Sequence, residues 1–409
     1  MHPDPRVLRI SDYTYELPEE RIARYPLPQR DSSRLLVYRD GEIEEDKFQH
    51  LPRYLYEEST LVLNTAKVVR ARMLFYKPTG GAIELFCLEP HPQYADITTA
   101  MANTGEVLWQ CLVGGAAKWK AGTSLGLSVG DLQVTADMVE RNTGDFTIRF
   151  SWTPTGLSFA EVLSLVGQVP LPPYIGRNAE QSDESRYQTL FAEHEGSVAA
   201  PTASLHFTPV VLDALGQMGV HTANVTLHVG AGTFMPVKSE VTGGHRMHRE
   251  WMEVSAETVM QLMRSSGNSI IAGGTTALRT LESLYWIGRK IADTPAIDLK
   301  DLDVDQWEPY DHPSEMNVEE SLGALYDWMQ ARNMPRLITR TGILIAPGYR
   351  FRIADGLITN FHQPQSTLLL LVAAFVGNDW KKIYDYALSH DFRFLSYGDG
   401  SLLWRNQRY

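Results

Sequence analysis

The sequence contains very little cysteine. Cys87 and Cys111 are the only two among 409 residues. Two cysteines cannot form a zinc site by themselves, and they exclude the disulfide framework that holds small secreted domains together. A reducing compartment is the simplest interpretation, so we expect a cytoplasmic protein.

Long apolar runs are also missing. The longest, Leu368–Val376, is far shorter than the ~20 residues that a membrane-spanning helix needs. The N-terminal stretch MHPDPRVLRISDYTYELPEE carries charges throughout and lacks the apolar segment of a signal peptide. We therefore expect no membrane partner, and we predict that the apolar run is a buried strand or helix of the core.

Positive charge is in deficit, with 37 Lys and Arg against 49 Asp and Glu and a net charge of -12. Such a balance argues against a nonspecific nucleic-acid binder, because phosphate contacts need local positive charge. Basic residues are nevertheless concentrated early in the chain, at Arg21, Arg24, Arg30, Arg34, Lys67, Arg70 and Arg72. They form either a local basic surface or a set of solvated side chains, and the sequence leaves both open.

The pattern of expected elements changes near Met73. From there to about Phe150, short β-like runs alternate with glycine-rich turns, which predicts a small antiparallel β-barrel. On both sides of it, helical and strand patterns alternate. We therefore predict an α/β main domain, a barrel-like mixed sheet with helices, formed by residues 1–72 and 151–409, with the small barrel inserted at 73–150.

A strand that ends in a glycine turn is the first candidate for chemistry. The stretch TLHVGAGTF, Thr226 to Phe234, runs from an apolar strand into Gly230 and Gly232. Glycines at a strand end let the backbone approach a ligand closely, and α/β folds bind ligands at such loops. The third glycine of a dinucleotide fingerprint is missing, so a nicotinamide or flavin site is a weak interpretation. An ordinary tight turn is the alternative.

A histidine precedes a predicted helix. His206 lies in PTASLHFTP, directly before a helix that we expect to begin with Thr208 as its N-cap and Pro209 at its first position. The positive end of that helix would lower the pKa of the imidazole and keep it neutral. A neutral imidazole can accept a proton or polarise an oxygen. A purely structural histidine is equally compatible with the pattern.

A second strand–glycine–helix arrangement follows at SIIAGGTTALRTLES. Thr275 and Thr276 stand where a helix N-terminus can hold an anion or a carboxylate. Arg279 and Glu282 are three residues apart on the same predicted helix, so the simplest expectation is that they pair with each other.

Two further segments offer polar groups. In GHRMHREWMEV the pattern His-x-x-His occurs without His-Glu-x-x-His or a nearby cysteine, so we expect no metal. In TNFH, Asn360 and His362 stand at a junction suited to binding polar edges of a substrate. Tyr397 and Asp399 flank a turn near the C-terminus that could face the same cleft.

Taken together and in order, these segments resemble the S-adenosylmethionine:tRNA ribosyltransferase-isomerases of queuosine biosynthesis. The resemblance runs through almost the whole chain. The segments that carry it are YELPEERIARYPLPQRDSSRLLV, VPLPPYI with DESRYQT, GSVAAPTASLHFT, VTLHVGAGTF, GTTALRTLES, PGYRF, TNFH and SYGD.

The resemblance implies an enzyme that transfers and isomerises the ribosyl part of S-adenosylmethionine. The acceptor would be 7-aminomethyl-7-deazaguanine at the tRNA wobble position, and the products epoxyqueuosine-tRNA, adenine and methionine. S-adenosylmethionine would be a cosubstrate, with no other cofactor. The partners would be a tRNA carrying the deazaguanine base and S-adenosylmethionine, and we expect a monomer. The implied fold, an α/β main domain with an inserted small β-barrel, agrees with the pattern above.

This chemistry indicates roles for the candidate residues. The sulfonium acidifies the C5′ hydrogens, so a base is needed there, and a proton donor helps adenine to leave. The candidates for proton transfer are His206, His228 and His362. The candidates for substrate binding are Asn64, Arg72, Thr202, Phe207, Gly230, Gly232, Thr233, Phe234, Thr275, Thr276, Arg279, Glu282, Tyr349, Asn360, Phe361, Tyr397 and Asp399.

The chain departs from the family pattern at three charged positions. Thr65, Met235 and Gln365 stand where the family usually has Asp, Arg and Lys. These departures predict lost contacts to a phosphate or carboxylate. They leave open a divergent paralogue that uses S-adenosylmethionine on another nucleoside or RNA, and a noncatalytic RNA-binding protein. A metal-dependent hydrolase is the weakest alternative. Residues 286–340 also form a longer segment than the family pattern leads us to expect, with no role indicated by the sequence.

Overall fold

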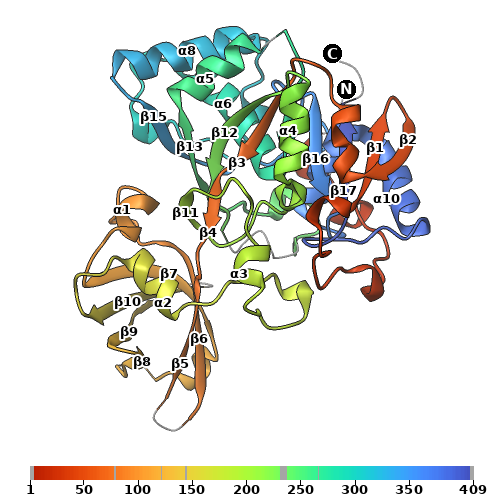
Figure 1. Ribbon diagram of the computed structural model, residues 1–409. Helices are drawn as coiled ribbons and strands as arrows, with labels where there is room; N and C mark the ends of the chain where they lie inside the picture. Colours follow the sequence, from red (N-terminus) through yellow and green to blue (C-terminus); the bar gives the residue numbers. More distant parts are fainter. Residues whose placement is uncertain are drawn as a thin grey trace.

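The computed structural model describes residues 4–77, 80–120, 122–142, 145–230, 237–265 and 267–405. The chain forms a large α/β body and a smaller β-barrel that lies beside it, at the lower left of Figure 1. The fold class expected from the sequence is confirmed.

A nine-stranded mixed sheet is the frame of the large body, in the order β15-β13-β12-β3-β14-β16-β17-β1-β2. The strands are β1 (Arg34–Arg39), β2 (Glu42–Lys47), β3 (Thr60–Asn64), β12 (His221–Leu227), β13 (Glu250–Ser255), β14 (Ile270–Gly273), β15 (Arg336–Thr341), β16 (Gly356–Asn360) and β17 (Gly400–Trp404). The four central strands β12, β3, β14 and β16 pair in parallel. Their carboxyl ends therefore lie at one edge of the sheet.

Helices cover both faces of this sheet, and β3 shows how. Its side chains alternate: Val62 joins one apolar cluster with helix α6, while Leu61 and Leu63 join another with Phe207. A strand buried on both faces has a nearly continuous apolar sequence, and TLVLN, the sequence of β3, follows this pattern. The helices of the large body are α3 (Asp183–Arg186), α4 (Pro209–Gln217), α5 (Ala256–Arg264), α6 (Thr275–Asp293), α7 (Glu308–Asp311), α8 (Val318–Ala331), α9 (Thr367–Val376) and α10 (Trp380–Ser389).

The longest apolar run of the sequence is a core helix. It forms α9, in which Ser366 caps the N-terminus by accepting a hydrogen bond from the Leu369 backbone N–H. Of the two alternatives left by the sequence, a buried strand or a helix, the structure has the helix. Within the part of the chain described, none of the helices combines the length and the apolar character needed to cross a membrane.

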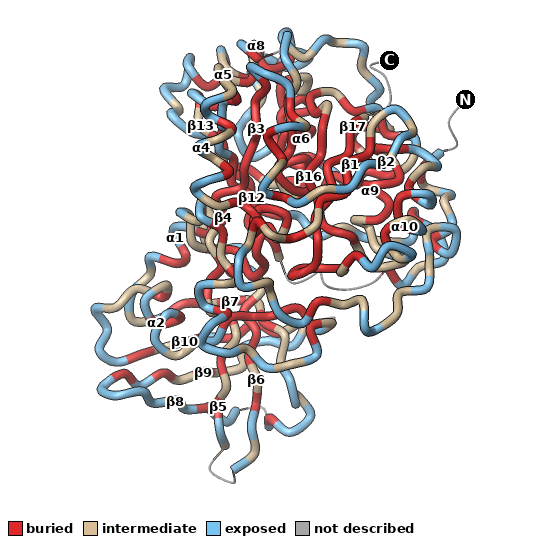
Figure 2. The backbone as a smooth tube through the Cα atoms, turned by 45° about the vertical axis from the view of Figure 1, so that its right-hand side comes forward, coloured by how far each residue is buried: buried red, intermediate tan, exposed pale blue. Residues whose placement is uncertain are grey.

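The β-barrel closes on itself in the order β10-β7-β6-β5-β8-β9, and every pairing is antiparallel. Its strands are β5 (Arg72–Tyr76), β6 (Ala82–Pro90), β7 (Glu106–Gly114), β8 (Leu125–Val129), β9 (Leu132–Arg141) and β10 (Phe146–Thr153), with helices α1 (Ile97–Met101) and α2 (Phe159–Val166) against it. Trp109, Phe150 and Phe159 fill its interior. The burial of β7 alternates along the strand. β3 is instead buried throughout, as Figure 2 shows.

The two bodies are joined through a short parallel pair, β4 (Ala66–Val68) and β11 (His194–Ser197). β4 follows directly from the carboxyl end of β3, and β5 of the barrel begins four residues after β4 ends. The barrel is therefore held at the edge of the main sheet where the parallel strands end (Figure 1).

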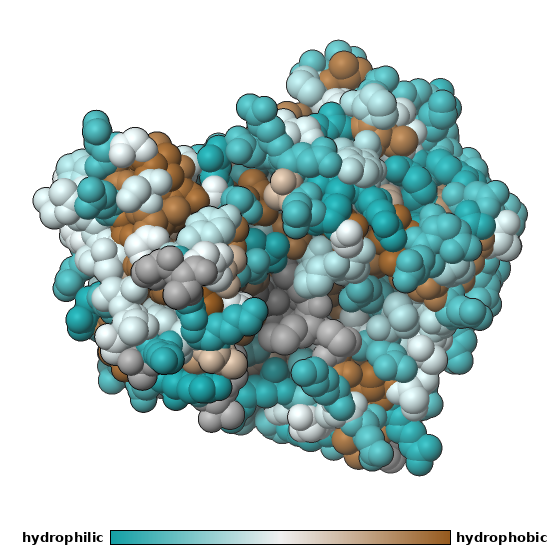
Figure 3. Space-filling view, turned by 90° about the horizontal axis from the view of Figure 1, so that it is seen from below, coloured by the Kyte–Doolittle hydropathy of each residue, from teal (hydrophilic) through white to brown (hydrophobic). Residues whose placement is uncertain are grey.

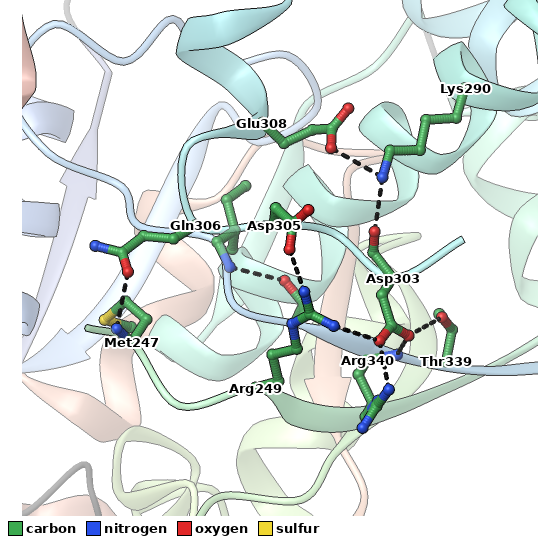
Figure 4. A network of polar contacts seen from close by, with 11 residues as sticks. Met247, Arg249, Lys290, Asp303, Asp305, Gln306, Glu308, Thr339 and Arg340 are labelled. Atoms are coloured by element: carbon green, nitrogen blue, oxygen red, sulfur yellow. Dashed lines mark hydrogen bonds and ion pairs between the residues drawn. The ribbon is translucent and has the colours of Figure 1, made fainter. Parts of the chain in front are cut away.

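Part of the segment of unassigned role is fixed to the main domain by a polar network (Figure 4). The Asp303 carboxylate accepts hydrogen bonds from the Thr339 hydroxyl at 3.1 Å and forms ion pairs with Arg340 at 2.7 Å and Arg249 at 3.0 Å. Lys290 of α6 pairs with Glu308 at 2.8 Å. The acidic stretch near residue 303 is therefore ordered structure of the main domain.

Candidate active site

The parallel strands deliver several candidate residues to one edge. β12 ends before His228, β14 before Gly274 and β16 at Asn360. Ligands of α/β folds bind outside the carboxyl ends of parallel strands, where the loops are free to vary. Gly274 has a φ of 115°, which an L side chain rarely adopts, so glycine allows the sharp turn into α6.

Two adjoining cavities lie at this edge. Cavity A is lined by Thr202, Gly274, Thr275, Thr276, Asn360, Phe361 and His362, together with Tyr174, Tyr187, Val229, Thr359, Ser366 and Leu368. Cavity B is lined by Gly230, His245, His248, Glu250, Arg279 and Leu368, among others. The cavities share Leu368 and receive successive residues of one loop, Val229 and Gly230. Seen from below, the surface is hollowed between the two bodies, with a largely hydrophilic rim (Figure 3).

A chain of hydrogen bonds connects Ser33 and His206 to Asn360 and Thr202, which line cavity A. The Thr202 hydroxyl donates to Oδ1 of Asn360 at 2.8 Å, and Nδ2 of Asn360 contacts Nε2 of His206 at 3.2 Å. Nδ1 of His206 lies 2.8 Å from the Ser33 hydroxyl. His206 therefore acts on cavity A through Asn360, as a residue that positions the amide.

Burial, and not the neighbouring helix, is the main reason why His206 is neutral. The side chain is fully enclosed, and desolvation lowers its pKa from 6.5 to about 4. The expected neutral state is therefore present, but the expected cause, the positive end of α4, is not the leading one. Thr208 does cap α4 as expected, accepting from the Val211 backbone N–H.

His362 lines cavity A and is held on several sides. Its Nε2 lies 2.8 Å from the Thr359 hydroxyl, and its backbone N–H donates to the Tyr384 hydroxyl at 3.0 Å. The Tyr15 hydroxyl donates to its backbone carbonyl. Burial lowers the pKa of its imidazole to about 3. The ring is thus a neutral group with a defined orientation.

His228 differs from the other two histidines. Its backbone N–H donates to the Trp251 carbonyl at 2.8 Å, but its ring atom Nδ1 is buried and has no hydrogen-bond partner among the described residues. Burial lowers the pKa of the imidazole to about 4. Gly196, whose φ is 139°, packs so close that a Cβ there would lie 2.9 Å from Nδ1. His228 directly precedes the loop that lines both cavities, yet it lines neither of them itself.

Arg279 and Glu282 do not pair with each other. Nη1 of Arg279 donates to Glu250 of β13, on the wall of cavity B. The Glu282 carboxylate turns the other way and accepts from the Tyr349 hydroxyl and from the backbone N–H groups of Arg352, Ile353 and Ala354. The predicted ion pair between Arg279 and Glu282 is therefore wrong, because each side chain binds a partner from another part of the chain.

Several residues predicted to bind substrate lie in the interior. Glu282 and Tyr349 hold the loop before β16, as above, and line neither cavity A nor cavity B. Phe207 is fully buried and packs on the rings of Phe48 and Phe191. Asn64 is also fully buried and bridges the ends of β3 and β12 through both backbone polar groups of Leu227. Direct contact with a substrate is therefore not supported for these four residues.

Three more predicted residues are fixed by structural contacts outside the two cavities. The Tyr397 hydroxyl donates to Asp183 at 2.7 Å. Asp399 accepts from the backbone N–H groups of Arg34 and Arg393, which closes the turn before β17. Arg72 belongs to barrel strand β5 and lies 3.3 Å from Glu84. The expectation that Tyr397 and Asp399 face the same cleft as Asn360 stays a prediction: neither residue lines cavity A or cavity B, and the Asp399 backbone carbonyl lies 3.3 Å from Nδ2 of Asn360.

The second half of the glycine turn lies outside the described residues. This applies to the predicted residues Gly232, Thr233 and Phe234 and to the departure at Met235. Of the other departures, Thr65 is buried and its hydroxyl lies 2.9 Å from the hydroxyl of Thr226. Gln365 has a φ of 57° and donates its backbone N–H to the Tyr13 carbonyl at 2.9 Å.

Two tyrosines that the sequence did not single out line cavity A. The Tyr174 hydroxyl lies 2.7 Å from that of Ser396, and burial raises the pKa of the Tyr187 hydroxyl. The buried Thr276 hydroxyl, on the same cavity, has no hydrogen-bond partner among the described residues. Tyr174 and Tyr187 belong to the motifs VPLPPYI and DESRYQT, so the motifs were visible but not the burial that distinguishes these two rings.

The early basic residues are largely neutralised by acidic neighbours. The pairs are Arg21 with Asp391, Arg24 with Glu19, Arg34 with Glu45, Lys67 with Glu195, Arg70 with Glu184 and Arg72 with Glu84. Arg30 instead donates to the backbone carbonyls of Ser185 and Gln188. These contacts favour paired surface side chains over a continuous basic surface.

No metal centre is formed by the described side chains. Within those ranges, no group of three or more His, Cys, Asp or Glu residues is placed to hold an ion. His245 and His248 line cavity B, and burial lowers the pKa of His245.

Comparison with known proteins places this arrangement in a family. Residues 10–403 match the family described as "Queuosine biosynthesis protein". The chain is 38% identical over 399 residues to the S-adenosylmethionine:tRNA ribosyltransferase-isomerase of Magnetococcus marinus, covering 97% of this chain and 94% of that one. It is 38% identical over 400 residues to the enzyme of the same name from Trichlorobacter lovleyi, covering 96% and 99%.

Among solved structures, the S-adenosylmethionine tRNA ribosyltransferase of Thermotoga maritima is similar at 28% identity and a TM-score of 0.45, covering 96% of this chain and 99% of that one. The sequence matches extend over nearly the full length of both partners. The chain belongs to the family of queuosine biosynthesis proteins, whose relatives at this level of identity are named S-adenosylmethionine:tRNA ribosyltransferase-isomerases.

Proposed function

We propose that this protein transfers and isomerises the ribosyl part of S-adenosylmethionine onto 7-aminomethyl-7-deazaguanine at the wobble position of tRNA. The products are epoxyqueuosine-tRNA, adenine and methionine. The observation that carries the proposal is the family match over residues 10–403, which includes every strand-end loop of the candidate site. The substrates are S-adenosylmethionine and a modified tRNA, the protein acts as a monomer in the cytoplasm, and no further cofactor takes part.

Cavity A suits the nucleoside end of S-adenosylmethionine. Tyr174, Tyr187 and Phe361 give it aromatic walls, and aromatic faces are the usual surfaces on which bases stack. The hydroxyl of Tyr187 and that of Thr276, which has no partner among the described residues, supply polar groups for the edge of a base or for the ribose. Thr275 and Thr276 also begin helix α6, where backbone N–H groups are free to donate.

His228 is the strongest candidate for the base that removes a C5′ proton. A general base must be neutral at the working pH and must have an acceptor nitrogen available. Its pKa of about 4 meets the first condition. For the second, Nδ1 is engaged by no hydrogen bond among the described residues, but it packs against Gly196, so the ring must turn to present it to a substrate. His206 meets only the first, because both of its ring nitrogens are already engaged. His362 lines the cavity and is the candidate for polarising an oxygen of the substrate.

Much of the rate enhancement is expected from positioning. The sulfonium of S-adenosylmethionine already supplies the driving force, so the protein must hold the ribosyl carbon against the acceptor amine. The barrel is held at the edge where the parallel strands end (Figure 1), and the hollow between it and the main domain offers an approach for the anticodon loop (Figure 3). We propose this hollow as the entry for tRNA.

The test is an incubation of the purified protein with S-adenosylmethionine and tRNA that carries the aminomethyl-deazaguanine base, followed by chromatography for free adenine. The matched control is the same tRNA with guanine at the wobble position. Adenine release on the modified tRNA alone supports the proposal. Binding of S-adenosylmethionine without release would favour a paralogue with another substrate. RNA binding without cosubstrate binding would favour a noncatalytic protein.

A further inference from the structure

A buried ion pair forms part of the wall of cavity B. Arg279 of α6 and Glu250 of β13 are only 6% and 5% exposed, and Nη1 of the arginine donates to the carboxylate. The other oxygen of Glu250 accepts from the Gly230 backbone N–H at 3.1 Å. Glu250 thus ties the guanidinium to the loop that connects the two cavities.

The opposite side of the same guanidinium has no partner in the described part of the chain. Nε and Nη2 of Arg279 are both buried, and neither has a hydrogen-bond acceptor among the described residues. Leaving two donors of a charged group buried without an acceptor is strongly unfavourable, so native structures normally supply one. Nε and Nη2 lie on one side of a planar group, in the geometry that binds both oxygens of a carboxylate.

The remaining walls of cavity B fit a short chain that ends in an anion. Lys238 and Arg246 add positive charge, and Glu250, already paired with Arg279, is the only acidic residue among the described residues of the lining. Ile343, Leu344 and Leu371 supply apolar surface. This combination matches the methionyl part of S-adenosylmethionine, an aliphatic chain that runs from the sulfonium to an α-amino acid group with a free α-carboxylate.

We infer that Arg279 binds the α-carboxylate of S-adenosylmethionine through Nε and Nη2, so that cavity B holds the methionyl part while cavity A holds the nucleoside. The inference rests on the proposed function. An RNA phosphate suits the site less well, because a phosphodiester is linked on both sides and cannot easily reach a side chain that is 6% exposed. A terminal carboxylate can reach it.

The test compares S-adenosylmethionine with its decarboxylated analogue by calorimetry. The wild-type protein is expected to bind S-adenosylmethionine tighter by about ten- to a hundredfold, the usual effect of a charge-assisted hydrogen-bonded pair. In R279Q this preference should fall to near unity. In R249Q, whose arginine pairs with Asp303 and Asp305 outside the cavity lining (Figure 4), the preference should be unchanged.

Two further variants distinguish the loss of a carboxylate contact from a general loss of folding. R279Q leaves Glu250 buried without its cation, so the double variant E250Q/R279Q removes both charges together. R279K keeps a cation for Glu250 but lacks the planar two-donor side, and it should also lose most of the preference. Thermal unfolding of each variant establishes which of them are folded.

The outcomes separate this inference from the proposed function. Failure of the wild type to bind either compound would contradict the proposed function. Equal binding of both compounds by the wild type, or a preference that survives in the folded Arg279 variants, would overturn the inference and leave the function standing. A preference that survives in R279Q while tRNA affinity falls would assign Arg279 to a phosphate instead, and would also overturn it.

Discussion

The amide of Asn360 determines the tautomer of His206. Nδ2 of Asn360 lies 3.3 Å from the backbone carbonyl of Asp399, which can only accept, and its Oδ1 accepts from Thr202. The amide nitrogen therefore faces the carbonyl and also Nε2 of His206 at 3.2 Å. Nε2 must then be the acceptor, and the proton of the neutral ring is on Nδ1, directed at the Ser33 hydroxyl.

The three buried histidines predict acid sensitivity. Burial lowers the pKa values of His206 and His228 from 6.5 to about 4 and that of His362 to about 3. Below their usual pKa the unfolded histidines bind protons that the folded ones do not, so stability is full at neutral pH and falls as the pH drops through that value. The expected loss is on the order of 1 kcal/mol per pH unit for each histidine.

Urea unfolding at a series of pH values from neutral to mildly acidic measures this effect. H206Q should be less stable at neutral pH but should show a shallower loss on acidification, because one of the three proton sites is gone. Identical pH slopes for H206Q and the wild type would mean that His206 is protonated in the folded protein.

Replacement of His228 by Gln should abolish most turnover and leave cosubstrate binding nearly intact. The glutamine keeps a polar side chain of similar reach but cannot accept a proton at neutral pH. Loss of a general base typically reduces the rate by about 10²- to 10⁴-fold. Steady-state kinetics and calorimetry on the same preparation separate the two effects.

The matched control is H221Q. His221 begins the same strand, β12, but is exposed and near Glu58, far from the strand's carboxyl end. H221Q should retain wild-type kinetics. Near-normal turnover in H228Q would remove His228 from the mechanism.

Glu282 is expected to matter for stability and not for substrate affinity. In E282A, the Tyr349 hydroxyl and three backbone N–H groups would lose their acceptor inside the core. Orphaned buried donors cost about 1–3 kcal/mol each, partly relieved by relaxation, so we expect a loss of at least about 3 kcal/mol in the free energy of unfolding. Denaturant unfolding measures this loss. A stable E282A variant with a raised KM for S-adenosylmethionine would restore the substrate-binding role suggested by the sequence.

Arg70 should contribute little to the electrostatics of RNA binding. It already pairs with Glu184 at 2.7 Å and donates to the Ser164 carbonyl at 2.8 Å. In R70A, the slope of log Kd against log salt concentration should therefore match that of the wild type. A slope reduced by about one unit would show that Arg70 contacts a phosphate when RNA is bound.

Features that depend on local sequence were predictable. The strand Thr60–Asn64 is a short apolar run bounded by polar residues, a pattern that has few other solutions. The N-cap Thr208 agrees with its prediction because capping depends on neighbours three residues away. The closed barrel was visible as short β-like runs separated by turns.

Features that depend on tertiary contacts were not predictable. Glu282 lies three residues after Arg279 on the same helix, but the partner of Arg279 is Glu250. Glu250 precedes Arg279 by 29 residues and belongs to strand β13. His206 precedes a helix, but its pKa is controlled by burial, which comes from residues far away in the sequence, such as Phe48. Asn64 and Phe207 were both predicted to bind substrate, but a sequence pattern does not separate residues that build the site from residues that contact a substrate.

The most direct test of the account is mass spectrometry of the nucleosides from tRNA digested after reaction with the protein and S-adenosylmethionine. Starting from tRNA with the aminomethyl-deazaguanine base, we predict that this nucleoside is converted to epoxyqueuosine, in equal amount to the adenine released, and that H228Q leaves it unconverted. A wild-type protein that binds S-adenosylmethionine and this tRNA but leaves the nucleoside unchanged would contradict the proposed function.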